Sequence, residues 1–355
     1  MKLCTPYLII RQKRLARFRA SSRMRLVSKR RLSSNEAYVR PGESIIAPTI
    51  ITLDRPDGIH MVKFLRAIAN TVLNSEKSTR LDFRNTKTIH VSGAILLFAE
   101  LDRIISLSTL HKPITITEPR QSRPRQVLKQ IGILQLTGDT SDVIPVRDDV
   151  VFWKSTKGYN QTGDALGPIL EFVADRANRD HIKQVELSGI WRGVSEAVAN
   201  TVDHAYILPR GDGFSGLSDT KWWMFTQIRN QYFSAAVCDL GCGYSDTINL
   251  TLPEEFRALW QQLLPGINKD VVAIQTAMEY GRSGTHANNR GKGSRDALSI
   301  LKKHGTGWLQ ILSNGGWLKL EYSNGVETKI ESGEIGIDIR GTIIWWTLPL
   351  QGATT

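Results

Sequence analysis

The sequence predicts an α/β chain, in the broad α+β sense, with two folded parts behind a basic N-terminal tail. Its 355 residues correspond to about two domains, because a domain averages roughly 150 residues. With 41% hydrophobic and 23% charged residues, the composition is that of a protein that buries ordinary cores. Short apolar runs typical of strands alternate with segments of helical periodicity, which favours sheets covered by helices.

The first folded part is expected between residues 45 and 138. Its apolar pattern predicts three strands that alternate with three helices. The strands are expected at 45–53, 80–83 and 114–117, and the helices at 57–74, 92–108 and 123–131. A polar stretch from Gly138 to Asp142 ends this part, so we place the boundary between 138 and 148.

The second folded part is expected between residues 148 and 350 and is richer in strands. The strands are predicted at 150–153, 222–228, 232–239, 307–313, 317–322 and 342–348. The helices are predicted at 163–178, 181–206, 271–279 and 291–304. The helix at 271–279 lies within a long irregular section, 240–290, and long loops in compact domains are usually functional or mobile.

Positive charge is concentrated in the tail, residues 1–40. Residues 1–35 hold three Lys, eight Arg and no acidic residue, within a chain of net charge +12. Of the 46 basic side chains the tail thus holds 11, and the other 35 nearly balance the 34 acidic ones. Such a block is expected to be disordered, and it is typical of arms that contact nucleic acid or anionic lipid through counterion release. The alternatives are a solubilising tail, an organellar transit peptide, or residues upstream of a start at Met24.

The compartment is expected to be the cytoplasm. The longest apolar run, 94–99, is far shorter than the roughly 18 residues that would span a bilayer, so no membrane segment is predicted. Cys4, Cys238 and Cys242 are too few for a disulfide framework or a thiolate zinc site. Both observations favour a soluble protein of a reducing compartment.

Four polar residues recur on one side of the helix predicted at 181–206. Glu196, Asn200, Asp203 and His204 are spaced i, i+4, i+7 and i+8, which places them on one helical face. Small and apolar residues between 194 and 205 fill the opposite face, so the polar stripe is expected to face away from the core. On spacing alone, a solvated helix face is favoured over a binding site.

Two further motifs combine glycine with a polar residue at the end of a strand. Asp239 ends an apolar strand and is followed by Gly241 and Gly243, a spacing that lets backbone approach a ligand closely. Gly341 and Thr342 open the last predicted strand.

A third glycine motif lies directly before the helix predicted at 291–304. It consists of Gly291, Lys292 and Gly293. Free amides at a helix N-terminus, together with a lysine, favour phosphate. An isolated turn of this kind is weak evidence for a phosphate site, but all these motifs follow one another in a recognisable order.

In this order, residues 150–350 resemble the GHKL superfamily of ATP-binding domains, the Bergerat fold of gyrases, mismatch-repair ATPases and sensor histidine kinases. Residues 196–205 are similar to its N box, 239–243 to its first glycine box, 291–293 to its second, and 341–342 to its terminal Gly-Thr. The segment between the glycine boxes corresponds to the lid, and Ser294 and Arg295 depart from the small residues common there.

The resemblance implies a role for each of five residues in binding Mg²⁺ and ATP or in its turnover. Asn200 supplies an oxygen to Mg²⁺, and Glu196 acts as general base toward water. Asp239 accepts the adenine amino group, Gly243 lets the ring lie against the backbone, and Thr342 supports this contact.

The remaining members of the implied ATP-binding set lie in the same boxes. They are Asp203, Gly241, Gly291, Lys292 and Gly293, of which the last three face the phosphates. A catalytic role for His204 is not expected.

The first part resembles the STAS fold of anti-sigma-factor antagonists. The resemblance rests on topology and on the segments 81–83, 89–93 and 125–132. In those antagonists a phosphorylatable serine opens the helix, whereas here Val91 takes its place and Ser92 is expected to be the N-cap.

Three functions are considered for such a combination. The first is a Mg-ATP-binding regulatory protein, an ATPase or anti-sigma-type serine/threonine kinase that acts on a protein partner through the STAS-like part. The second is a nucleic-acid-associated ATPase tethered by residues 1–35. The third is a catalytically degenerate scaffold, which the intact Glu196, Asn200 and Asp239 argue against. By analogy with the family, a homodimer is one expected assembly.

Overall fold

The computed structural model describes most of the two folded parts. The described residues are 44–54, 56–151, 153–159, 193–214, 220–229, 232–251, 258, 268–283, 298, 301–302 and 304–349. The basic tail, the helix predicted at 163–178 and the glycine motif at 291–293 lie outside them. Helices and strands are mixed throughout, so the predicted α+β class is confirmed.

The first part contains short parallel strands and the helices that connect them. The strands are β1 (Ser44–Ile46), β2 (Ile50–Ile51), β3 (Thr79–Asp82), β4 (Thr88–Ile89) and β5 (Ile114–Thr117). The helices are α2 (Asp57–Ala69), the short π-helix η1 (Asn70–Asn74), α3 (Val91–Leu107), α4 (Ser122–Gln130) and α5 (Ile133–Leu136). The predicted β-α alternation is confirmed, with element ends that differ by a few residues.

Parallel pairing joins these strands in the order β1-β3-β5, and β2 pairs with β4. The strand predicted at 45–53 is divided into β1 and β2 because Pro48 lies between them and cannot donate to a ladder. Two backbone hydrogen bonds bridge the division: Ala47 N donates to Asp82 O at 3.0 Å, and Lys87 N donates to Thr49 O at 2.8 Å. The two short pairs are thus parts of one interrupted parallel arrangement.

The second part is built on an antiparallel sheet of seven strands in the order β11-β10-β9-β12-β8-β7-β6. These strands are β6 (Trp153–Gly158), β7 (Trp222–Arg229), β8 (Tyr232–Asp239), β9 (Gly307–Ser313), β10 (Gly316–Ser323), β11 (Val326–Glu334) and β12 (Thr342–Pro349). Its helices include α6 (Asp148–Val151), the short π-helix η3 (Thr201–Ala205), α9 (Tyr244–Thr251) and α11 (Lys269–Ser283). Residues 193–200 are also helical and run into η3.

Three elements of the second part differ from prediction. The strand predicted at 150–153 is wrong: the helical turn α6 precedes β6, which begins at Trp153. Asp149 is the second residue of that turn and forms ion pairs with Arg123 at 2.6 Å and Arg147 at 2.9 Å, and an acidic residue is favourable in the first turn of a helix. Strand β11 and helix α9 lie in segments where neither was predicted.

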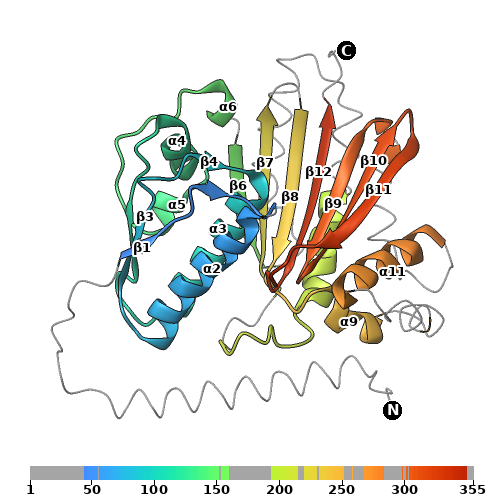
Figure 1. Cartoon of the computed structure of the whole chain (residues 1–355), viewed down its shortest axis with the longest axis horizontal. Coiled ribbons are helices and arrows are strands. Elements are labelled where there is room, and N and C mark those ends of the chain that lie inside the picture. Colours follow the sequence, from blue (N-terminus) through green and yellow to red (C-terminus); the bar gives the residue numbers. More distant parts are fainter. Residues whose placement is uncertain are drawn as a thin grey trace.

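Both faces of the middle strands of the seven-stranded sheet are buried, whereas the edge strand β11 is largely exposed. Figure 1 shows α2 and α3 beside β6, β7 and β8, with α9 and α11 on the other side toward β10. Because side chains alternate along a strand, Ala236 and Cys238 pack with the first part, whereas Ala235 and Val237 pack with the helices of the second.

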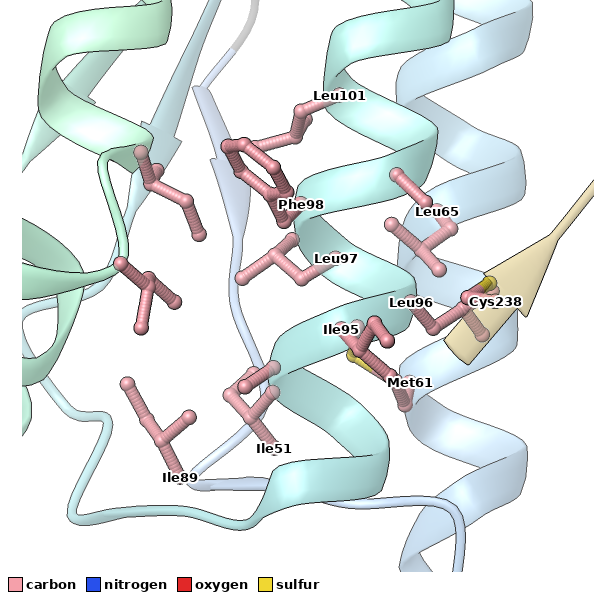
Figure 2. Close-up of a cluster of buried hydrophobic side chains, with 14 of the residues drawn as sticks. Ile51, Met61, Leu65, Ile89, Ile95, Leu96, Leu97, Phe98, Leu101 and Cys238 are labelled. Carbon is pink, nitrogen blue, oxygen red and sulfur yellow. The ribbon is translucent and has the colours of Figure 1, made fainter. Parts of the chain in front are cut away.

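The two parts therefore share one hydrophobic cluster. It joins α2 and α3 to one face of the sheet, and Figure 2 shows Leu96 of α3 beside Cys238 of β8. Trp153 and Phe225 of the sheet belong to the same cluster, with ring centroids 5.0 Å apart in an edge-to-face arrangement. This sharing leaves the opposite face of the sheet, and its ends, to form a site.

Candidate functional site

The end of the sheet where β8 stops brings several polar residues into a row. Asp239 of β8 pairs with Thr342 of β12, and Thr342 pairs in turn with Ser313 of β9. Asp239, Thr342 and Ser313 are 7%, 6% and 1% exposed. They share the face of the sheet on which residues 193–205 pack, because Val237 and Ile311, two positions away, belong to that cluster.

Asp239 is a buried carboxylate whose surroundings stabilise its charge only in part. Its Oδ1 accepts a hydrogen bond from Gly241 N at 2.9 Å. Burial raises the pKa of Asp239 to about 7, although backbone hydrogen bonds from Gly241 and Thr342 and the charge of Arg210 act to lower it. A carboxyl group that titrates near neutrality at the end of a sheet is a candidate binding group.

The glycine loop after Asp239 packs directly on the end of the short π-helix η3. A Cβ atom at Gly241 would lie 2.1 Å from Ala205 O, and Cys242 N donates to the same oxygen at 2.9 Å. The absence of a side chain at Gly241 therefore lets the loop join the helix that carries the polar stripe. This contact connects two motifs that lie 34 or more residues apart in the chain.

Gly243 has a structural role in addition to the one the resemblance implies. Its φ is +77°, and a Cβ atom there would lie 2.5 Å from the Asn314 amide nitrogen. The side chain of Asn314 occupies that side of the loop, so glycine is needed here for the loop's own packing. Asn314 Nδ2 donates to Cys242 O at 2.9 Å, which fixes the loop against the β9–β10 turn.

Sequence reasoning missed two residues that complete the polar row. Ser313 Oγ accepts a hydrogen bond from Tyr244 N at 3.0 Å and lies 3.1 Å from Thr342 Oγ1. Tyr206 OH accepts from Leu240 N at 3.1 Å and donates to Lys221 O. Neither residue stands in a recognisable motif: Ser313 depends on the pairing of β9 with β12 for its place, and Tyr206 depends on the end of η3.

The helix at 193–200 and the short π-helix η3 present the predicted stripe as expected. Their packing side is buried and consists of Val194, Ala197, Val198, Thr201 and Ala205. On the other side, Glu196 and Asn200 are half-buried, whereas Asp203 and His204 are exposed. Glu196 and Asn200 are therefore the members of the stripe placed between the core and solvent.

The predicted metal-binding residue lies among the described residues, whereas the predicted phosphate-binding residues do not. Within the described ranges, no group of three His, Cys, Asp or Glu side chains could hold a metal ion. The Asn200 amide oxygen and phosphate oxygens are of the kind that a magnesium ion prefers. Gly291, Lys292 and Gly293 lie outside the described residues.

In the first part, the start of helix α3 differs from prediction at Ser92. Helix α3 begins at Val91, and its N-cap is His90, so the predicted N-cap role of Ser92 is wrong. Ser92 is 2% exposed, and its hydroxyl accepts a hydrogen bond from Leu53 N at 3.2 Å. Gly93 permits this packing, because a Cβ atom there would lie 2.5 Å from the Ile51 backbone. The hydroxyl is thus enclosed in the core rather than presented to a kinase.

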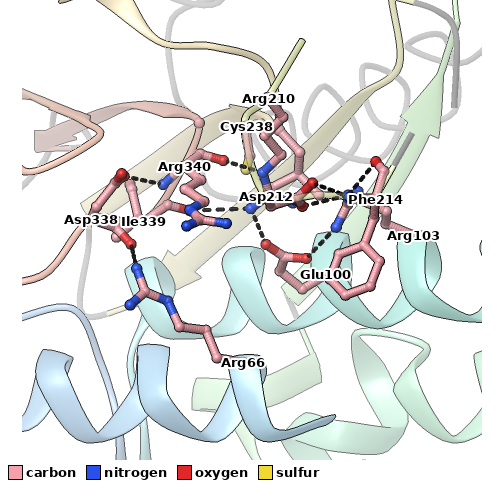
Figure 3. Close-up of polar contacts among 12 residues, drawn as sticks. Arg66, Glu100, Arg103, Arg210, Asp212, Phe214, Cys238, Asp338, Ile339 and Arg340 are labelled. Atoms are coloured by element: carbon pink, nitrogen blue, oxygen red, sulfur yellow. Dashed lines mark hydrogen bonds and ion pairs between the residues drawn. The ribbon is translucent and has the colours of Figure 1, made fainter. Parts of the chain in front are cut away.

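A network of buried charges connects α3 with the segment that follows η3 (Figure 3). Glu100 and Arg103 of α3 form ion pairs with Arg210 and Asp212, respectively, with 2.5 Å between Arg103 Nη2 and Asp212 Oδ2. All four side chains are less than a tenth exposed. Two acids and two arginines make the cluster neutral overall, which is the condition for burying charge.

In comparisons with known proteins, no family model matches the sequence, and no curated protein or solved structure shows significant similarity to it. In the part of the chain that the structure describes, no helix is both long and apolar enough to cross a bilayer. Functional argument therefore depends on the geometry of the site.

Proposed function

We propose that this protein binds ATP with Mg²⁺ at the end of the seven-stranded sheet and acts as a GHKL-type regulatory protein, through ATP hydrolysis or phosphoryl transfer to a partner protein. The observation that carries the proposal is the pairing of Asp239 with Thr342, with Ser313 beside them, at a buried sheet end. Sequence motifs about 100 residues apart thus meet at one end of the sheet, which supports the proposal of an adenine-binding site there.

The chemistry of the polar row suits an adenine base. A buried carboxylate is a strong acceptor for an amino group, and Thr342 adds a hydroxyl that can donate or accept. The bound base would cover Asp239, and the apolar side chains of Val237 and Tyr244 lie nearby on the same face of the sheet. The Asn200 amide and the phosphate oxygens would hold Mg²⁺, which would neutralise phosphate charge when bound.

Glu196 suits a role in turnover rather than in binding. It lies one helical turn before Asn200 on the half-buried side of the helix. A carboxylate next to the metal-binding amide can accept a proton from an attacking water or hydroxyl group.

The experiment is isothermal calorimetry of the full chain with Mg·ATP, with Asp239→Asn as the test variant. The substitution replaces an acceptor-only carboxylate oxygen with an amide donor, and we expect affinity to fall about tenfold to a hundredfold or more. Asp246→Asn is the matched control, because Asp246 is exposed on the adjacent helix α9 and should leave affinity unchanged. Mg·GTP is the control ligand, since guanine presents a carbonyl where adenine presents its amino group.

Turnover is tested separately with Glu196→Gln. This variant should bind Mg·ATP as the unmodified protein does and lose phosphate release, because binding and proton transfer depend on different residues. Unmodified protein that binds no nucleotide would remove the proposal. Normal turnover by Glu196→Gln would remove only the role of Glu196.

The first part is proposed as the element that a protein partner or signal acts on. Because Ser92 is enclosed, we place any phosphoacceptor in the partner rather than at that helix start. Nucleic-acid binding through residues 1–35 remains the alternative; it predicts binding that weakens steeply with salt and is abolished by deletion of those residues.

A further inference from the structure

The segment that leads into Thr342 makes a tight turn against strand β8. Arg340 has φ +53° and Gly341 has φ +154°, so two successive residues adopt positive φ. A Cβ atom at Gly341 would lie 2.3 Å from Asp239 O, which shows how closely the turn approaches the proposed adenine-binding residue. A non-glycine residue with positive φ persists only where surrounding contacts define it.

One side of this turn is held by Asn314 from the β9–β10 turn. Asn314 N donates to Gly341 O at 3.0 Å, and Gly341 N donates to Asn314 Oδ1 at 3.3 Å. Ile339 N also donates to Asn314 O at 3.0 Å. These bonds satisfy the amides of Ile339 and Gly341, and Arg340 N donates to Asp338 Oδ1 at 2.7 Å. The carbonyl groups of Ile339 and Arg340 are left to other donors.

The other side of the turn is held by the side chain of Arg210. Its Nε donates to Arg340 O at 2.7 Å, and its Nη2 donates to Ile339 O at 3.3 Å. The same guanidinium forms an ion pair with Glu100 of α3 and lies 3.5 Å from Asp212 (Figure 3). Only a planar group with several donors can make all these contacts at once.

We infer that Arg210 is a positioning residue for the proposed nucleotide site: by binding the carbonyl groups of Ile339 and Arg340 it sets Gly341 and Thr342 beside Asp239, and through Glu100 it ties this position to helix α3. The inference rests on the proposed function for its ligand. It assigns to the first part a direct mechanical connection to the site, although that part packs on the opposite face of the sheet.

Among the described residues, Arg210 is the cation whose charge acts on Asp239. The titratable groups around Asp239 are Tyr206, Tyr244, Cys238 and Cys242, and they add no positive charge. The charge of Arg210 opposes the effect of burial and lowers the pKa of Asp239. Removing this charge should therefore shift the ionisation of Asp239 to higher pH.

The test compares Arg210→Lys and Arg210→Met with Arg103→Lys and Arg103→Met in the full chain. Arg103 is the matched control, because it is buried in the same network and pairs with Glu100 and Asp212, but it donates to Phe214 O instead of the turn. Lysine keeps the positive charge but has one nitrogen in place of the separate Nε and Nη2 donors of the guanidinium. Methionine loses the charge and the donors, so the two substitutions separate geometry from charge.

The first readout needs no nucleotide. Hydrogen–deuterium exchange of the peptide covering 339–343 should rise at least tenfold in Arg210→Lys and stay unchanged in Arg103→Lys. The second is Mg·ATP affinity against pH. We expect at least a tenfold loss in both Arg210 variants, and a shift of the pH midpoint to higher values in Arg210→Met alone.

The outcomes separate this inference from the proposed function. Suppose that the unmodified protein binds ATP and that the Arg210 variants have the same hydrogen–deuterium exchange and the same ATP affinity. The inference is then overturned, and the proposed function stands. If the unmodified protein binds no ATP, the proposed function fails, and the assignment of Arg210 to a nucleotide site fails with it. Should Arg210→Met not fold, the exchange and affinity of Arg210→Lys still decide.

Discussion

Two buried aspartates, one on each side of the interface between α3 and the sheet, differ sharply in their partners. Asp102 of α3 is 2% exposed and pairs with Lys157 Nζ at 2.6 Å and Lys221 Nζ at 2.5 Å. It also accepts a hydrogen bond from Trp223 Nε1 at 2.9 Å. Asp239 is 7% exposed, and its Oδ1 accepts from a backbone amide rather than from a cation.

The two pKa shifts have opposite directions for this reason. Burial alone would raise the pKa of Asp102, but hydrogen bonds and charges from Lys157 and Lys221 outweigh it and hold the pKa below its usual value. Burial dominates at Asp239 and raises its pKa to about 7. Asp102 is therefore satisfied by the protein itself, whereas Asp239 keeps acceptor capacity at a cost in stability, as expected of a binding group.

The largest effect is expected from breaking the satisfied site with Asp102→Asn. This substitution leaves the ammonium group of Lys221, whose side chain is 3% exposed, buried without a counter-charge. Loss of one partner of a buried pair typically costs about 3–5 kcal/mol. Urea unfolding at pH 7 should show this loss. A loss below about 1 kcal/mol would mean that the pair is not a principal connection between the two parts.

The second effect is the pH dependence of the unfolding free energy, and it has opposite signs at the two aspartates. An acid with a raised pKa in the folded state contributes stability that is fully present below its unfolded pKa of 3.8 and is lost as the pH rises to about 7. Between pH 5 and 8, the unmodified protein should thus lose on the order of 2–3 kcal/mol relative to Asp239→Asn.

Asp102 provides the internal control for that experiment. Its pKa is lowered, so its stabilisation is present above pH 3.8 and is lost only as the pH falls through the lower folded value. The loss in unfolding free energy caused by Asp102→Asn should therefore be the same at pH 5 and pH 8. Parallel pH curves for the unmodified protein and Asp239→Asn would contradict the assignment of a near-neutral pKa to Asp239.

The sequence was sufficient for those elements whose signal is local. The strands at 114–117, 232–239 and 307–313 match their predictions residue for residue, because each is a compact run of apolar or β-branched residues. Strand β11 carries many charges at an edge of the sheet and lacks that pattern. Its hairpin could have been found from Asn324-Gly325, a pair that adopts φ +52° and +74° and favours the tight turn of a hairpin.

The site was predictable only as separate motifs. Asp239 and Thr342 can be singled out by the glycines beside them, but their pairing follows from the strand order β8-β12-β9, which no local pattern contains. Arg210 and Glu100 are 110 residues apart in the chain. Glu100 lies on helix α3 of the first part, and Arg210 lies in the irregular segment after η3. Side chains that act across such distances depend on tertiary packing, so residue type alone does not reveal them.

The smallest effect tests whether the surroundings of Asp239 depend on backbone packing, as those of Asp102 depend on charge. Gly243→Ala should be compared with Gly138→Ala, since both glycines have positive φ, +77° and +69°. A Cβ atom at Gly138 meets nothing within 4 Å, whereas at Gly243 it would overlap Asn314 at 2.5 Å.

Both substitutions incur the left-handed conformational cost of about 1–2 kcal/mol, but only Gly243→Ala adds overpacking, so its excess loss should be about 1–3 kcal/mol in urea unfolding. That excess should persist at 1 M salt, because contact between neutral atoms is not screened, while the ion pairs of half-exposed Lys157 weaken there. Equal losses at the two glycines would show that Asn314 moves aside easily. The loop would then be free to adapt to a bound base, and the close packing at Gly243 would not define the site.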